Sequence, residues 1–229
     1  MGKFDSVRTE DRTILASAER SATNSSEIQN NDSARGVLVV LNVTEVTDAT
    51  NEVQSLLVDA TAGTYTLTFG ADTTGALAYN ADAATVETAL RALTSVGGAN
   101  VSVAPAGPGM TITFNGALAA QNVAQITADS SSLTGNTATA SVITTTQGSA
   151  ATSLTLSVTG TDPASGASVT LLTGAAVTSI STNSYRIYPG LTAVANATAS
   201  DVLPKTWKVT VTHGGSVAST YSVGACLLA

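Results

Sequence analysis

The stretch Gly36-Val-Leu-Val-Val-Leu-Asn-Val-Thr-Glu-Val-Thr47 decides the fold, because β-branched residues run through it almost without a break. Residues of this kind favour extended backbone, so a strand is predicted here, buried on both faces in its first half and alternating in its second half. A matching stretch comes only at Ser153-Leu-Thr-Leu-Ser-Val-Thr-Gly-Thr161, where apolar residues alternate with hydroxyl residues. These two strands are predicted to be hairpin neighbours, separated by a block of different character.

That block, residues 51–150, has a complete set of elements of its own. An amphipathic helix is predicted within residues 80–96, capped by Asp82 and stopped by Gly97-Gly98, because Val86, Ala89, Leu90 and Leu93 share one helical face. Strands surround it at residues 52–58, 63–69, 100–103, 110–114, 123–128 and 137–145. A strand set with one helix and its own apolar faces is what a small α+β domain requires.

After residue 151 the all-β pattern resumes, with strands predicted at residues 167–172, 184–188, 207–212 and 217–228. The last two are predicted to form a β-hairpin around His213-Gly-Gly-Ser216. The predicted fold is therefore mainly β. It is a discontinuous β-sandwich of residues 36–50 and 151–229, with residues 51–150 inserted at a hairpin tip, where insertion is tolerated.

Residues 1–35 form a third part, an extended N-terminal arm. They hold 11 of the 25 charged side chains in the chain and few large apolar residues after Leu15. Such a stretch cannot bury enough surface to fold alone. Two interpretations stay open, a frayed terminus or a segment that becomes ordered on a neighbouring subunit.

The overall composition restricts the classes of partner. The net charge is -7 and only 11% of the 229 residues are charged, whereas nucleic-acid binders carry clustered basic residues, so no nucleic-acid partner is expected. No apolar run approaches the roughly 20 residues that a membrane span needs, and the first residues lack the apolar region of a secretory signal. The single Cys226 excludes an intramolecular disulfide and is expected to be a buried structural residue.

Candidate catalytic groups are few. His213 is the only histidine and lies in a predicted turn, which favours a surface role over that of a general base. One Cys and one His exclude the usual zinc sites, and no calcium-loop pattern occurs. No enzymatic activity, cofactor or metal is expected. Tyr185, Tyr188 and Tyr221 are interpreted as core residues in preference to a contact patch.

Four stretches carry a resemblance to known proteins. They are Arg20-Ser-Ala-Thr-Asn-Ser-Ser26, Ala34-Arg-Gly-Val-Leu-Val-Val-Leu-Asn-Val-Thr44, Thr159-Gly-Thr-Asp-Pro-Ala-Ser-Gly166 and Leu203-Pro-Lys-Thr-Trp-Lys-Val-Thr-Val-Thr-His213. Together they resemble the capsid decoration (minor capsid) proteins of tailed bacteriophages, especially those that infect actinobacteria. The inserted block, with Gly63-Thr-Tyr-Thr-Leu-Thr-Phe69, resembles a module of phage structural and bacterial surface proteins.

The resemblance implies a structural virion protein on the capsid exterior. Its expected partners are the major capsid protein and other copies of itself, often as a trimer, with Arg8, Arg12, Arg20 and Arg35 of the arm as candidate capsid contacts. Two alternatives stay open. One is a phage tail tube or baseplate component. The other is a carbohydrate-binding or adhesive surface module with Tyr185, Tyr188 and Trp207 as its platform.

Overall fold

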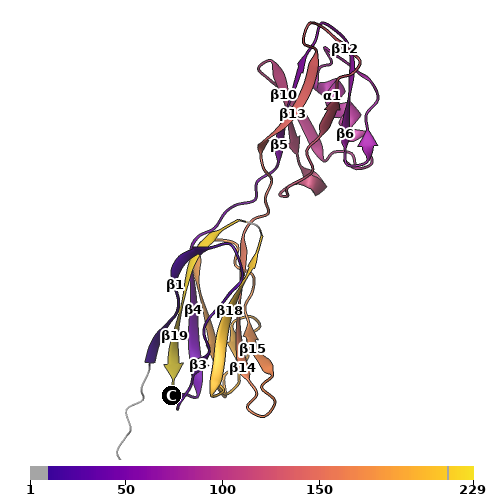
Figure 1. Ribbon diagram of the computed structural model, residues 1–229. Helices are drawn as coiled ribbons and strands as arrows, with labels where there is room; N and C mark the ends of the chain where they lie inside the picture. Colours follow the sequence, from indigo (N-terminus) through magenta and orange to yellow (C-terminus); the bar gives the residue numbers. More distant parts are fainter. Residues whose placement is uncertain (1–9, 216) are drawn as a thin grey trace, which may run out of the picture. The chain divides into compact units, whose positions relative to one another are not determined.

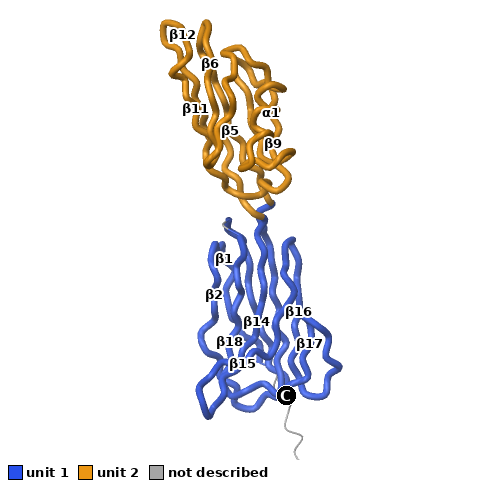
Figure 2. Tube along the Cα trace, turned by 90° about the vertical axis from the view of Figure 1, so that its right-hand side faces the viewer, with its two compact units in different colours: residues 1–48, 151–229 blue, residues 49–150 orange. Residues whose placement is uncertain are grey.

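The computed structural model describes residues 10–215 and 217–229, and the mainly β architecture is confirmed. The chain divides into two compact units, each with its own hydrophobic core (Figure 2). Unit 1 is Met1–Asp48 with Ala151–Ala229, and unit 2 is Ala49–Ala150. The chain therefore leaves unit 1 once, completes unit 2 and returns.

Unit 1 contains two five-stranded sheets (Figure 1). Sheet 1 has the order β1 (Glu10–Arg20), β19 (Ser219–Leu228), β4 (Gly36–Glu45), β16 (Ser181–Ile187), β17 (Thr198–Ala199). Sheet 2 has the order β15 (Ser168–Thr173), β14 (Ser153–Thr161), β18 (Thr206–Gly214), β2 (Asn24–Ser25), and β3 (Gln29–Asn30) also pairs with β18.

The core of unit 1 lies on the faces that alternate residues of these strands share. Every second side chain along β4, β14, β18 and β19 is buried, which is the period of two that a strand imposes. The fully buried set from β4, β14 and β18 is Val37, Val39, Leu41, Leu154, Leu156, Val158, Val209 and Val211, with Trp207 at 1% exposure. Hydroxyl residues occupy many of the outward positions, so a chain with few charges can still be solvated.

The prediction of an extended N-terminal arm is wrong for residues 10–35. Strand β1 pairs antiparallel with β19 from Glu10↔Leu227 to Arg20↔Ser219, and β2 and β3 pair with β18. Within β1 only Ile14 is buried. The segment is held mainly by backbone hydrogen bonds at a sheet edge. Such bonds do not require apolar side chains, so the sequence of this segment shows no apolar pattern.

Both predicted hairpins, residues 36–47 with 153–161 and residues 207–212 with 217–228, are also wrong. Strand β4 pairs with β16 and β19 in sheet 1, whereas β14 pairs with β15 and β18 in sheet 2. The connection from β18 to β19 likewise passes between the sheets. Alternation shows which face of a strand is buried, but strands of either sheet satisfy it equally well. Unit 2 is thus inserted in a connection between sheets and not at a hairpin tip.

Unit 2 consists of two sheets and one helix. One sheet has the order β13 (Thr139–Thr146), β5 (Val53–Asp59), β10 (Gly109–Phe114), β9 (Val101–Ala106). The other is built on β6 (Ala62–Phe69), which pairs with β7 (Asp72–Thr73), β8 (Leu77–Ala78), β11 (Thr127–Asp129) and β12 (Leu133–Thr134). The helical segments are α1 (Ala83–Arg91) and a short 3-10 turn, η1 (Gly116–Leu118).

Helix α1 begins where the sequence predicts, because the Asp82 carboxylate accepts a hydrogen bond from the Thr85 backbone N–H at 2.8 Å. The bonds to Thr85 lower the pKa of Asp82, as expected for a carboxylate at a helix N-terminus. The helix ends earlier than predicted, at Arg91. A succession of turns then leads to Gly97 and Gly98, whose φ angles of 71° and 78° suit glycine.

A buried polar network joins β5 to the segment that precedes β11. Glu52 and Gln54 are only 1% and 0% exposed. The Gln54 amide donates to Glu52 Oε1 at 2.6 Å and accepts from the Ile126 N–H at 2.8 Å, while Glu52 Oε2 accepts from the Val123 N–H at 2.9 Å. These side chains take the place of a backbone ladder, so the predicted strand at residues 123–128 is reduced to β11.

Removal of residues 1–33 is expected to destabilise unit 1, because it deletes β1, β2 and β3 together with Ile14, whose burial alone contributes about 2 kcal/mol. Thermal unfolding followed by circular dichroism should show a lower melting temperature for unit 1. A chain that starts at residue 10 is the matched control, and unit 2 is an internal reference. Unchanged melting of the chain that starts at residue 34 would contradict the pairing described.

Substitution Gln54→Leu is expected to destabilise unit 2 by about 1–3 kcal/mol, because it leaves the Ile126 N–H without its partner and leaves Glu52 Oε1 with only the Thr144 hydroxyl at 3.4 Å. Urea unfolding measures this change. Gln147→Leu, at an exposed position of the same unit, is the control and should change the free energy of unfolding by less than about 0.5 kcal/mol. Equal effects of both substitutions would rule out the network as a source of stability.

Candidate functional site

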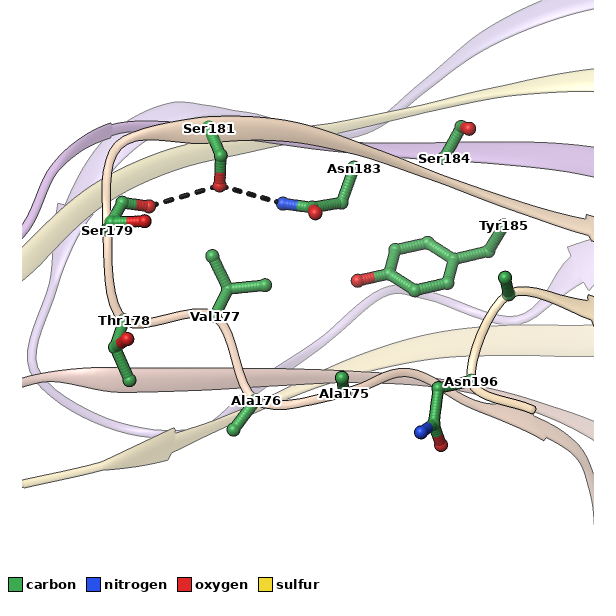
Figure 3. A pocket seen from close by; sticks show the side chains of 11 residues that line it. Ala175, Ala176, Val177, Thr178, Ser179, Ser181, Asn183, Ser184, Tyr185 and Asn196 are labelled. Atoms are coloured by element: carbon green, nitrogen blue, oxygen red, sulfur yellow. Dashed lines mark hydrogen bonds between the residues drawn. The ribbon is translucent and has the colours of Figure 1, made fainter.

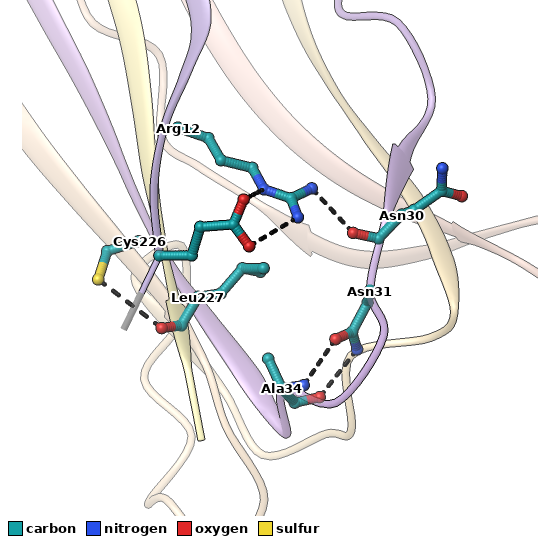
Figure 4. A network of polar contacts seen from close by, with 7 residues as sticks. Arg12, Asn30, Asn31, Ala34, Cys226 and Leu227 are labelled. Atoms are coloured by element: carbon teal, nitrogen blue, oxygen red, sulfur yellow. Dashed lines mark hydrogen bonds and ion pairs between the residues drawn. The ribbon is translucent and has the colours of Figure 1, made fainter. Parts of the chain in front are cut away.

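Arg12, one of the predicted capsid contacts, forms a hydrogen bond between the two sheets of unit 1 (Figure 4). Its guanidinium binds both carboxylate oxygens of Glu10, at 3.1 and 3.0 Å, and donates to the Asn30 carbonyl oxygen at 2.8 Å. Glu10 lies on β1 of sheet 1, and Asn30 lies on β3 of sheet 2. The hydrogen bond from Arg12 lowers the pKa of the Glu10 carboxyl. This guanidinium is occupied within its own chain.

Arg20 is also bound internally. Its guanidinium lies 4.6 Å from the centre of the Tyr221 ring and donates hydrogen bonds to the carbonyl oxygens of Ala16, Ala18 and Tyr221 at 2.6, 3.0 and 2.8 Å. A cation placed over an aromatic ring is attracted by the ring quadrupole. Arg20 therefore fixes the end of β1 against β19.

The remaining two predicted contacts are placed differently. The Arg35 guanidinium lies 5.6 Å from the centre of the Tyr188 ring, and the Arg35 backbone N–H donates to the Leu228 carbonyl at 2.8 Å. Arg8 lies outside the described residues. Thus the three described arginines do not form one site, and each has a partner in its own chain. The assignment of these residues to a capsid surface stays a prediction.

The aromatic platform considered for a carbohydrate-binding module is absent from the described surface. Tyr185 and Trp207 are buried in the core of unit 1, together with Tyr221. The Tyr188 hydroxyl donates to the Ala229 carbonyl oxygen at 2.8 Å. The interpretation as core residues is confirmed for Tyr185 and Tyr221, and the three proposed platform rings do not share an exposed plane.

His213 contacts Ser219, but the pair has the geometry of a structural contact. His213 Nε2 and Ser219 Oγ are 3.2 Å apart, and Ser219 is 1% exposed, so its hydroxyl is inaccessible to a substrate. The His213 backbone N–H donates to Thr23 Oγ1 at 3.2 Å. The contact joins the end of β18 to the start of β19 across the connection between the sheets.

The cysteine and the acidic residues do not form a catalytic or metal-binding arrangement within the described ranges. Cys226 is only half-buried, on the outward face of β19, so the prediction of a buried structural cysteine is wrong. Its partial burial raises the pKa of the thiol, and neighbouring Asp11 adds to the shift, so the nucleophilic thiolate is disfavoured. No group of three or more His, Cys, Asp or Glu residues within the described ranges could hold a metal ion. Within the same ranges no helix is long and apolar enough to cross a membrane.

Most of the exposed large apolar side chains of unit 1 lie towards one end of the sandwich. This distal end, formed by loops 31–35, 162–167 and 188–205, lies away from residues 48 and 151, where the chain leaves and re-enters unit 1 (Figure 1). The register places it there, because Gly36 of β4 pairs with Leu228 and Gly160 of β14 pairs with Trp207.

Four of the five large apolar side chains that the described part of unit 1 exposes lie in or beside the distal loops, namely Ile28, Val169, Val194 and Val202. The fifth, Ile180, lies towards the other end. Loops on a rigid β framework commonly carry binding residues. No pattern in the sequence marks these residues, because single exposed apolar residues in loops and at strand ends show no periodicity.

Comparison of the sequence with protein-family models and with curated proteins finds no match.

Substitution Arg20→Ala is expected to lower the free energy of unfolding of unit 1 by about 1–2 kcal/mol, because it removes the contact with the Tyr221 ring and three hydrogen bonds. Chemical denaturation gives the value. Arg186→Ala is the matched control, since Arg186 is exposed and its side chain makes no hydrogen bond or ion pair with a described residue. An unchanged stability of the Arg20 variant would show that this arginine is free for a partner.

Proposed function

We propose that this chain is a structural protein of a bacteriophage particle, a capsid decoration protein whose unit 1 binds the major capsid protein of the assembled head. The observation that supports the proposal best is the distal end, where Val194 and Val202 are exposed on loop 188–205, Val169 at the start of β15 and Ile28 between β2 and β3. The resemblance of β4, the turn after β14 and β18 to decoration proteins supports the same function.

The contact surface in this proposal differs from the arm that the sequence suggests. Because Arg12 and Arg20 have partners in their own chain, the distal loops, which include Arg35, replace the arm as the principal contact. Apolar side chains buried at the centre of an interface contribute more to affinity than charges at its rim.

Unit 2 faces solvent in this proposal. It contains six acidic side chains and one arginine, which gives a net charge of -5 out of -7 for the whole chain. Like charges on neighbouring copies repel one another, so an acidic outer unit would limit association between crowded particles. Binding to the assembled shell and not to its free subunits stabilises the shell by mass action, by RT ln(1 + [L]/Kd) for each site.

The double substitution Val169→Asp with Val202→Asp is expected to weaken binding to heads at least about tenfold, because a charge desolvated in an apolar contact costs more than 1.4 kcal/mol. Binding is measured by co-sedimentation with expanded heads assembled without this chain. Ile180→Asp is the matched control, since Ile180 is 67% exposed and Val202 is 58% exposed.

Two results would count against the proposal. One is equal binding by the double variant and the unsubstituted chain. The other is localisation of the chain on the tail by electron microscopy of intact particles, which would instead support a tail component.

A further inference from the structure

A pocket of about 390 Å³ lies in unit 1 beside β16 (Figure 3). It is bounded by the segment 175–179, which connects β15 to β16, by the first residues of β16 and by the turn at Asn196. Small-molecule sites have volumes of about 300–1,000 Å³. The pocket is therefore large enough for a small ligand. It shares loop 188–205 with the distal end through Asn196 and Ala197, and none of the arginines described above lines it.

Tyr185 is the residue that singles out this pocket. Its side chain is 4% exposed, and its hydroxyl points into the pocket between Val177 and Asn183 without a hydrogen bond to any described residue (Figure 3). The ring packs closely against Gly174, because a Cβ at this position would lie 2.5 Å from the ring atom Cε1. The phenol thus offers a hydrogen bond that the protein itself does not use.

The neighbouring side chains offer further neutral polar groups. Asn183 Nδ2 donates to Ser181 Oγ at 2.9 Å, and Ser181 Oγ donates to the Ser179 carbonyl oxygen at 3.1 Å. This chain of bonds orients the Asn183 amide and leaves its Oδ1 as an acceptor. Burial raises the pKa of Tyr185, so its hydroxyl stays protonated and can both donate and accept.

The remaining lining restricts the class of ligand. Apolar contact comes from Ala175, Ala176, Val177 and Ala197, and every lining residue is uncharged. An anion would find no cationic side chain there, and a cation would find no carboxylate. A purely apolar ligand would leave the Tyr185 hydroxyl unpaired. A neutral molecule with several hydroxyl groups and an apolar face satisfies both kinds of surface.

We propose that this pocket binds one neutral sugar residue, with the Tyr185 hydroxyl and the Asn183 amide as its hydrogen-bonding groups. The sugar could be a free monosaccharide or the terminal residue of a surface glycan. The proposal does not rest on the proposed binding to heads, because none of the residues substituted in the head-binding test, Val169, Val202 and Ile180, lines the pocket.

The test is a titration of the purified chain with the methyl glycosides of glucose, galactose, mannose and N-acetylglucosamine, followed by NMR, and a glycan array with neutral and sialylated members. At least one neutral glycoside or neutral terminal sugar should bind. Tyr185→Phe should weaken that binding about tenfold, because it removes one hydrogen bond from a buried site. Its stability should not fall, because the lost hydroxyl has no partner in the chain.

Tyr65→Phe is the control, since it removes a tyrosine hydroxyl from unit 2, where the Tyr65 hydroxyl is buried without a hydrogen bond to a described residue. This variant should bind sugar like the unsubstituted chain. Binding to glycosides and array together indicates a site for single sugars, and binding to the array alone indicates recognition of a glycan terminus. The proposal is overturned if no neutral sugar binds, if only sialylated glycans bind, or if Tyr185→Phe binds unchanged.

Discussion

Unit 1 depends on one constraint, the need of two sheets to bury a continuous apolar face against each other. Residues of β4 such as Val39 and Leu41 are fully buried only because β14 and β18 supply a second layer. The connections β4 to β14, β15 to β16 and β18 to β19 therefore pass between the sheets. Unit 2 occupies one of these connections, and its own core makes the long excursion compatible with folding of the sandwich.

The charged side chains near the N-terminus serve this architecture. Edge strands expose unpaired backbone groups, and charges along them oppose pairing with other chains. Strand β1 is such an edge strand. Glu10 and Arg12 form an ion pair on it, and Arg20 fixes its end against Tyr221. The charged residues that suggest a segment for binding neighbouring subunits thus help to hold β1 at the edge of its own sheet.

The surfaces that remain for partners are those where side chains have no packing or hydrogen-bonding partner within the chain. The distal loops expose apolar residues, and the pocket at Tyr185 contains a hydroxyl that no described residue satisfies. Both belong to unit 1. The pocket lining is uncharged, whereas the distal loops also carry Asp32, Arg35, Asp162, Asp201 and Lys205. Their chemistry differs, because Val169 and Val202 favour an apolar protein surface, whereas Tyr185 and Asn183 favour a polar ligand.

The strands that bury an alternating face, such as β4 and β14, and the helix start at Asp82 could be predicted from the residues alone, because they depend on local periodicity and capping. The order of strands, the pairing of β1 with β19 and the Glu52–Gln54 network were decided only by the tertiary structure. Backbone hydrogen bonds at a sheet edge are independent of side-chain type, and a buried amide resembles an exposed one in sequence. The pocket has the same origin, since residues 175–185 and Asn196 meet only when β16 takes its place beside β4.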